Sequence, residues 1–199
     1  MGTVAANPYY TKVVEEACME RIFLPTIRAM NEEGRTFKGC LYFGLMLTAD
    51  GPKVIEYNCR FGDPETQVVL PLLQTDLLTI MRAVEARKLA EVDVRWSTDS
   101  AACVVLASGG YPGQYETGKV ISFTAPLAQN VTCYHAGDRK EEWELVTSGG
   151  RVLGITATAP TLKEALRDAY AAADTVDFAG KYCRRDIGQR ALRALEMHE

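Results

Sequence analysis

Residues 42–67 decide the fold and read YFGLMLTADGPKVIEYNCRFGDPETQ. Aromatic and aliphatic residues fill Phe37 to Leu47 and again Lys53 to Asn58, on either side of Ala49-Asp50-Gly51-Pro52. Because Asp-Gly suits the positive φ angles of a tight turn, this pattern predicts a β-hairpin. The polar segment Cys59 to Thr66 follows the second strand directly, and a loop at a strand's end commonly carries functional groups.

Helices are predicted on both sides of this hairpin. Apolar residues recur at helical spacing from Val13 to Met30, which predicts one helix with Asn7-Pro8 as its N-cap and first turn and with a bend near Pro25. Asn31 to Arg35 ends it with a glycine suited to a left-handed cap. A second helix is predicted within Asp76 to Leu89.

A second module is predicted after the polar stretch Arg87 to Ser100, which loses the apolar pattern. We therefore expect two domains, 1–95 and 96–199. Thr161 to Glu164 is a capping box that opens a helix to about Phe178, and a last short helix follows Asp186. Short antiparallel strands with one packed helix give an α+β class, with strands expected at 101–107, 119–123, 131–135, 143–146 and 151–157.

The composition excludes several functional classes. A net charge of -4 is unlike that of a sequence-independent nucleic-acid binder, and no apolar stretch approaches the roughly 20 residues that span a bilayer. Met1 to Asn7 lacks the regions of a signal peptide, so we expect a cytoplasmic protein. The six cysteines form no CxxC pair and read as structural thiols. The only two histidines, His135 and His198, exclude a His-rich zinc site, and His135 reads as a strand-end polar residue.

The candidate chemistry lies at the end of the second hairpin strand. Glu56 and Asn58 are two residues apart, so their side chains share one face, and Arg60 continues that face if the extended conformation persists. A carboxylate and an amide oxygen are ligands that Mg²⁺ prefers, together with substrate phosphates. The alternative is a solvated strand end, which an isolated Glu-x-Asn-x-Arg pattern more often represents.

A longer sequence match favours the metal site over a solvated strand end. The segment EYNCRFGDPETQ, 56–67, resembles the signature of the phosphoribosylamine-glycine ligase (glycinamide ribonucleotide synthetase) family of ATP-grasp enzymes. Segments 39–47, 108–112, 149–154 and 185–188 resemble the same family in the same order, so the resemblance covers nearly the whole chain. It implies the C-terminal part of an ATP-grasp domain, built as helix, β-hairpin and helix, followed by a small α+β module.

The resemblance also implies an activity and its residues. The family joins glycine to 5-phosphoribosylamine in purine biosynthesis, using ATP and passing through glycyl phosphate. Glu56 and Asn58 would be ligands of Mg²⁺ or Mn²⁺, and Arg60 would stabilise phosphoryl or carboxylate charge beside the nucleotide. Asp63 and Glu65 would orient an amine or cap the following helix, and for Asp63 substrate contact and N-cap are equally favoured.

Other residues are weaker candidates. Arg151 and Arg185 are further candidates for substrate contact, although lone arginines are mostly solvated. Gly109-Gly110 and Gly149-Gly150 could approach a phosphate, but a Gly-Gly between short strands is usually a turn. Asp138 stands where the family pattern has threonine, which argues against a role for that turn.

Enzymes of this family are about twice as long and carry a nucleotide-fold domain and an ATP-binding lysine on the N-terminal side. We therefore expect this chain to be the C-terminal half, as a cleavage product, a partial gene product or one piece of a split protein, and to be inactive alone. Expected partners are glycine, 5-phosphoribosylamine, ATP and an N-terminal half in cis or trans, with no nucleic acid or membrane. The alternative is a non-catalytic binding or interaction module that keeps the fold.

Overall fold

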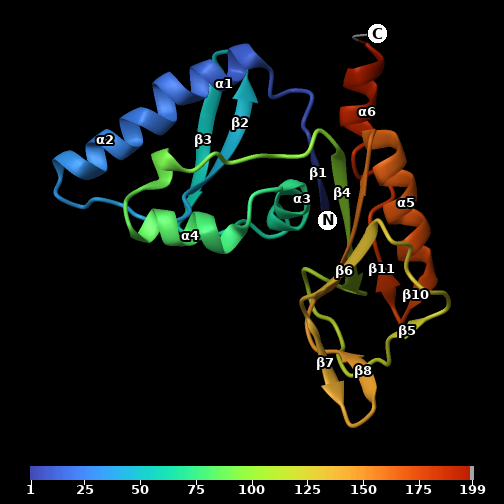
Figure 1. The fold of residues 1–199 in the computed structure, drawn as a ribbon. Helices are drawn as coiled ribbons and strands as arrows, with labels where there is room; N and C mark the ends of the chain where they lie inside the picture. The colour runs from blue at the N-terminus through green and yellow to red at the C-terminus, as the bar shows by residue number, and fades with distance from the viewer. Residues whose placement is uncertain (198–199) are drawn as a thin grey trace. The chain divides into compact units, whose positions relative to one another are not determined.

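A computed structural model describes residues 1–197, which fold into two compact units (Figure 1). The hairpin unit comprises Asn7–Gly62 and Leu73–Trp96. The sheet unit comprises Met1–Ala6, Asp63–Leu72 and the chain from Ser97 onward. Helices combine with antiparallel strands, which confirms the predicted α+β class. One histidine, His198, lies outside the described residues.

The hairpin unit begins with a continuous helix. Thr11 caps it by accepting a hydrogen bond from Val14 N at 3.4 Å, so the start predicted at Asn7-Pro8 was wrong. A π-helical turn lies just before Pro25, and the bend predicted there stays a prediction; Gly34 follows the helix at φ +71°, as its predicted cap requires. The helix has three segments: α1 (Lys12–Cys18), the π-helical turn (Met19–Phe23) and α2 (Leu24–Glu32).

The predicted hairpin is present as β2 (Tyr42–Thr48) and β3 (Gly51–Asn58). The hairpin is confirmed, but Thr48 pairs with Gly51 around the turn Ala49-Asp50, and of the Asp-Gly pair only Gly51 has a positive φ, +96°. Phe43 packs between Phe23 and Tyr57, with ring centroids 4.5 and 5.3 Å apart, so the helix covers one face of the hairpin.

The predicted second helix of this unit is α4 (Leu77–Glu85). The Asp76 carboxylate caps it by accepting from Thr79 N at 2.7 Å. A 3₁₀ turn, Leu89–Glu91, follows α4.

The sheet unit is built on a five-stranded antiparallel sheet in the order β1-β4-β9-β6, with β11 also paired to β4. The central strand β4 is almost wholly buried, as the run of small apolar residues predicts. The sequence prediction missed four strands of four residues or fewer, which are Gly2–Ala5, Asp138–Glu141, Val176–Asp177 and Lys181–Tyr182. The strands are β1 (Gly2–Ala5), β4 (Ser100–Ser108), β6 (Val131–His135), β9 (Arg151–Ala159) and β11 (Lys181–Tyr182).

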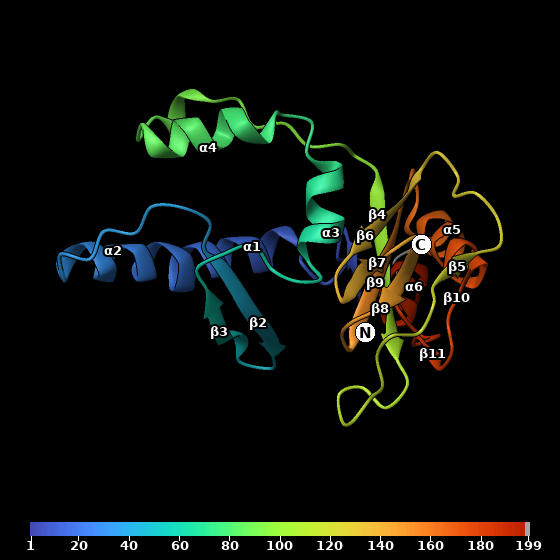
Figure 2. The same cartoon turned by 90° about the horizontal axis from the view of Figure 1, so that it is seen from below.

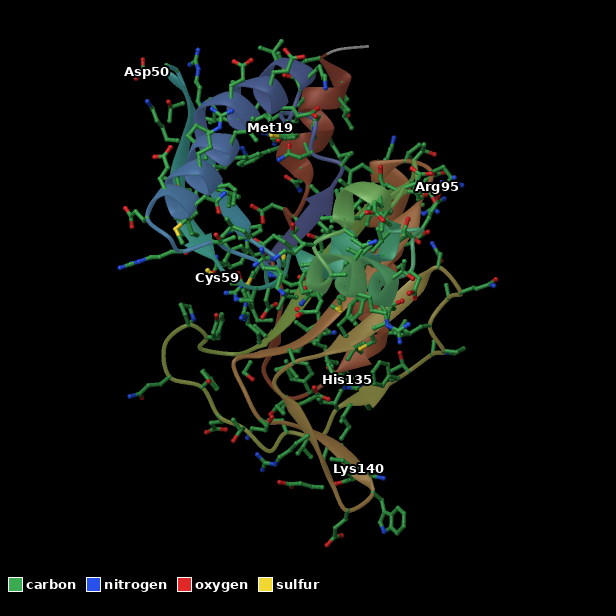
Figure 3. All side chains as sticks on the ribbon, turned by 60° about the vertical axis from the view of Figure 1, so that its left-hand side comes forward. Met19, Asp50, Cys59, Arg95, His135 and Lys140 are labelled. Carbon is green, nitrogen blue, oxygen red and sulfur yellow. The ribbon has the colours of Figure 1, made fainter. Side chains whose placement is uncertain are left out.

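Two shorter pairs complete the strands of this unit. The strands β7 and β8 form a separate hairpin, and Lys140 lies near its tip (Figure 3). The second pair joins β5 to a strand that directly follows the long helix α5. The bounds are β5 (Ser122–Phe123), β7 (Asp138–Glu141), β8 (Glu144–Thr147) and β10 (Val176–Asp177).

Alternate residues of β4 face two different layers. Ala102, Val104 and Leu106 belong to the larger core with helix α5 (Leu162–Thr175). The residues between them pack on Val68 of α3 (Thr66–Val69) and on the 3₁₀ turn Leu70–Leu72. Helices α5 and α3 therefore cover opposite faces of the sheet (Figure 2).

Both ends of α5 follow from local sequence. Thr161 and Glu164 form the predicted capping box, in which Glu164 N donates to Thr161 Oγ1 at 3.3 Å and Thr161 N donates to Glu164 Oε2 at 3.2 Å. The helix stops at Thr175 rather than near Phe178 because Val176 enters strand β10. The last helix, α6 (Gln189–Glu196), lies where it was predicted.

All six cysteines are free thiols; Cys18 and Cys103 are buried, whereas Cys59 is exposed. Within residues 1–197, no helix combines the length and apolar character that a bilayer crossing requires.

Candidate functional site

Glu56 and Asn58 lie side by side at the end of β3. Asn58 Nδ2 donates to Glu56 Oε1 at 2.9 Å, so the two side chains share one face as the spacing predicts. Asp50 marks the turn of the hairpin and Cys59 its opposite end, where the chain leaves β3 (Figure 3). The strand's pleat thus fixes a carboxylate beside an amide.

Gly44 provides the space that the Glu56 side chain occupies. It pairs with Glu56 across the hairpin, and a Cβ atom at Gly44 would lie only 2.9 Å from Glu56 Cγ. Any larger residue at position 44 would displace the Glu56 carboxylate. Gly44 was not singled out from the sequence, although a glycine inside a strand is itself a signal of close approach.

The donor set fits a hard divalent cation. With Asn58 Nδ2 turned toward Glu56, the amide oxygen Oδ1 accepts no hydrogen bond from residues 1–197. Carboxylate and amide oxygens suit Mg²⁺, which commonly takes one or two protein carboxylates plus phosphate oxygens. Those same residues contain no cluster of three His, Cys, Asp or Glu able to hold a metal alone. A cation at Glu56 and Asn58 would therefore need further oxygen ligands, such as nucleotide phosphates.

Arg60 lies beyond the strand, because β3 ends at Asn58 and the chain bends there. The extended path that would have carried Arg60 along the same face does not persist. Its Nη1 donates to the carbonyl of Phe61 at 2.8 Å, and Arg60 forms no ion pair within the described chain. The exposed guanidinium keeps donors for an anion.

Asp63 belongs to the sheet unit, where two side chains hold it. Gln67 Nε2 donates to Asp63 Oδ1 at 2.9 Å, and Arg151 Nη2 lies 2.8 Å from Asp63 Oδ2. The N-cap position of α3 is Glu65, whose side chain makes no capping hydrogen bond. The structure therefore excludes Asp63 as an N-cap. Gln67 was missed as a site residue, although it lies one helical turn after Asp63.

Arg185 lies apart from Asp63. Its Nη2 binds Asp174 Oδ1 at 2.7 Å, and its guanidinium lies over the Tyr170 ring at 5.8 Å. Asp174 is on α5, which covers the sheet face opposite to α3. Substrate contacts by Arg185 and by Glu65 stay predictions.

The glycine pairs behave as close-packed turns. A Cβ atom at Gly150 would lie 2.2 Å from the Tyr111 ring, and Gly110 has φ +98°. Ser108 Oγ donates to the Gly149 carbonyl at 2.9 Å and ties the two turns together. These contacts support the turn interpretation over a phosphate loop.

His135 ends β6, as Figure 3 shows, and its Nδ1 pairs with Asp138 Oδ2 at 2.5 Å. The Asp138 side chain is only 4% exposed and also accepts from Ala136 N at 3.0 Å. The pair satisfies a buried carboxylate, which agrees with the strand-end interpretation of His135.

Two family models match most of the chain. The model described as phosphoribosylglycinamide synthetase, ATP-grasp (A) domain, matches residues 1–66, and the C domain model of the same synthetase matches residues 101–190. Phosphoribosylamine-glycine ligase of Chlorobaculum tepidum is 47% identical over 194 residues, which cover 96% of this chain and 46% of that protein. The Vibrio cholerae ligase is 45% identical, with 96% and 45% covered. The chain thus spans about half the length of these relatives.

Solved structures of related enzymes also match this chain. The crystal structure of phosphoribosylamine-glycine ligase from Thermotoga maritima has a TM-score of 0.77 and 36% identity, and the match covers 94% of this chain and 46% of that one. The biotin carboxylase domain of a thermophilic 2-oxoglutarate carboxylase matches all of this chain and 47% of its own length, with a TM-score of 0.67 and 15% identity, and so shares the ATP-grasp fold alone. The chain belongs to the phosphoribosylglycinamide synthetase family.

Proposed function

We propose that this chain supplies the metal-binding and substrate-binding part of a phosphoribosylamine-glycine ligase. The reaction joins glycine to 5-phosphoribosylamine and converts ATP to ADP and phosphate. The observation that carries the proposal is the Glu56 and Asn58 pair, set opposite Gly44 in a chain of this family. Domains 1–95 and 96–199 would be the end of the ATP-grasp domain and the C domain, in a cytoplasmic enzyme without nucleic-acid or membrane partners.

Glu56 and Asn58 would hold Mg²⁺ or Mn²⁺ through one carboxylate oxygen and the amide oxygen. The bound cation supplies neutralisation of charge on the ATP phosphates. Arg60, whose guanidinium is exposed and forms no ion pair within residues 1–197, would bind the phosphoryl group or the glycine carboxylate as negative charge builds up. The three residues thus orient two anions that would otherwise repel each other.

The proposed reaction has two covalent steps. A glycine carboxylate oxygen attacks the γ-phosphorus, the bond to the β-phosphate oxygen breaks, and ADP leaves. The amine of phosphoribosylamine then attacks the acyl carbon of glycyl phosphate, and phosphate leaves with the former carboxylate oxygen. The amine loses one proton in forming the amide, and the leaving phosphate takes up that proton. Asp63 would accept an N-H of an amine, since its carboxylate stays partly exposed, whereas Glu65 and Arg185 remain candidates for the outer part of the substrate.

The hairpin unit presents apolar side chains that we propose are covered by the preceding part of the ATP-grasp domain. Met46, Leu47 and Ile55 are 54%, 42% and 61% exposed. A two-stranded sheet is at best marginally stable in isolation, so additional structure on this hairpin is favourable. We propose that an N-terminal half, in cis or in trans, provides this cover together with the ATP pocket, and that the chain alone is inactive.

Reconstitution tests the proposal. The chain would be mixed with a separately produced N-terminal half of a relative such as the Chlorobaculum tepidum ligase, and association would be confirmed by size-exclusion chromatography. ADP release that requires both glycine and phosphoribosylamine is expected. A folded, associated pair that releases no ADP would contradict the proposal and favour a non-catalytic binding module.

A further inference from the structure

Arg151 and Gln67 clamp a single residue of the signature segment. Arg151 Nη2 is 2.8 Å from Asp63 Oδ2, and its Nη1 donates to the Asp63 backbone carbonyl at 3.1 Å. Gln67 Nε2 occupies the other carboxylate oxygen, Oδ1, at 2.9 Å. Both carboxylate oxygens and the peptide oxygen of Asp63 are therefore fixed from two different elements, β9 and α3.

The backbone of Arg151, which makes most of these contacts, is held by its neighbours in the sheet. Arg151 begins β9 and pairs with Ala107 of β4. A Cβ atom at Gly137 would lie 2.4 Å from the Arg151 carbonyl oxygen, so the neighbouring turn packs directly against this backbone. A platform of this kind holds a side chain more precisely than a free loop does.

The Arg151 guanidinium is largely committed within the protein. Nη1 contacts both the Asp63 carbonyl and Met1 Sδ, and Nη2 contacts the Asp63 carboxylate. The Asp63 side chain, by contrast, remains 46% exposed, and each of its oxygens has a second lone pair. Asp63, rather than Arg151, is the member of this group that is open to a ligand.

We infer that Arg151 and Gln67 are positioning residues that aim the Asp63 carboxylate at a primary amine. This inference rests on the proposed function, in which the primary amines are those of glycine and phosphoribosylamine. A carboxylate whose oxygens are both oriented by donors presents its remaining lone pairs in fixed directions, which suits an N-H group and not an anion. Arg151 thus acts on the substrate through Asp63 and makes no contact of its own with a phosphate or carboxylate.

A kinetic double-mutant cycle in the reconstituted pair tests this role. The variants are Asp63→Asn, Arg151→Met and the double variant, with kcat and KM measured separately for ATP, glycine and phosphoribosylamine. Because misplacement of about 1 Å can cost about 100-fold, each single change is expected to lower kcat/KM about that much for one amine substrate while KM for ATP stays unchanged. The amine substrate affected identifies which amine Asp63 orients. The double variant should be no worse than Asp63→Asn.

Two further variants serve as comparisons for Arg151→Met. Arg167→Met breaks an exposed ion pair of equal length, 2.8 Å to Asp168, on α5 and should leave all constants unchanged. Gln67→Met keeps the side-chain length without the amide. It should lower kcat/KM for the same amine substrate that Arg151→Met affects. Losses that multiply in the double variant, or an unchanged Asp63→Asn enzyme, would overturn the inference. An inactive wild-type pair would instead count against the proposed function.

Discussion

Asn58 Nδ2 donates to Glu56 Oε1 across 2.9 Å, and this hydrogen bond turns the Asn58 amide oxygen away from the carboxylate. The pair therefore presents two kinds of oxygen on one face of β3. Gly44 on the paired strand supplies the space for it.

Replacing Glu56 by Gln removes the charged ligand and keeps the side-chain size. In the reconstituted pair we expect kcat to fall by at least about 100-fold, because charge stabilisation by a metal is worth several kcal/mol. The free energy of unfolding should change by less than about 0.5 kcal/mol, since Glu56 is exposed. Steady-state kinetics and urea denaturation measure the two effects. Glu32→Gln, at the exposed end of α2, is the matched control, and equal activity of both variants would contradict the metal assignment.

Replacing Gly44 by Ala places a Cβ atom 2.9 Å from Glu56 Cγ and forces the carboxylate to move. We expect the Mg²⁺ concentration for half-maximal activity to rise about 10-fold, as is typical when the surroundings of a metal ligand are disturbed. Thr48→Ser on the same strand keeps its hydroxyl and should leave that concentration unchanged. An unaltered metal requirement in Gly44→Ala would show that Glu56 is not held in this position for metal binding.

Replacing Thr161 by Ala removes the hydroxyl that accepts from Glu164 N and donates to Glu164 Oε2, and leaves the bond from Thr161 N to Glu164 Oε2 in place. The sheet unit should lose about 1 kcal/mol of stability, seen as a lower urea midpoint, while the activity of the reconstituted pair is retained. Thr161→Ser keeps the hydroxyl and should behave as the wild type. A midpoint as low for serine as for alanine would argue that the hydroxyl is not the stabilising group.

Burial raises the pKa of the Cys103 thiol from 9.0 to about 11. Below about pH 8 the thiol is largely neutral in both the folded and unfolded chains, so it has little effect on stability there. As pH rises from 9 towards 11 the unfolded thiol ionises first, and stability should fall. At about pH 8, iodoacetamide should modify exposed Cys59 while Cys103 stays unmodified, as mass spectrometry of tryptic peptides would show. Equal modification of both cysteines would be inconsistent with this burial.

Local chemistry made much of the fold predictable. The hairpin turn and the Thr161 capping box each act over four residues or fewer, so the sequence shows them directly. The pairing of Glu56 with Asn58 could also be predicted from the sequence, because strand geometry alone places alternate residues on one face.

The remaining features depend on contacts that sequence spacing does not reveal. Arg151 and Asp63 are 88 residues apart, and only the sheet brings them together. The strand β1 has four residues and gains its stability from pairing with β4. Arg60 was expected on the face of Glu56, but the chain bends after Asn58. In each case tertiary contacts outweigh the local pattern.

The most direct test of the central claim follows an oxygen atom. Glycine labelled with 18O in its carboxylate would be supplied to the reconstituted pair with ATP and phosphoribosylamine, and the released phosphate would be examined by mass spectrometry. If this chain completes a ligase that works through glycyl phosphate, each phosphate carries one 18O atom, and Glu56→Gln abolishes its formation. ATP hydrolysis that yields unlabelled phosphate would contradict the account.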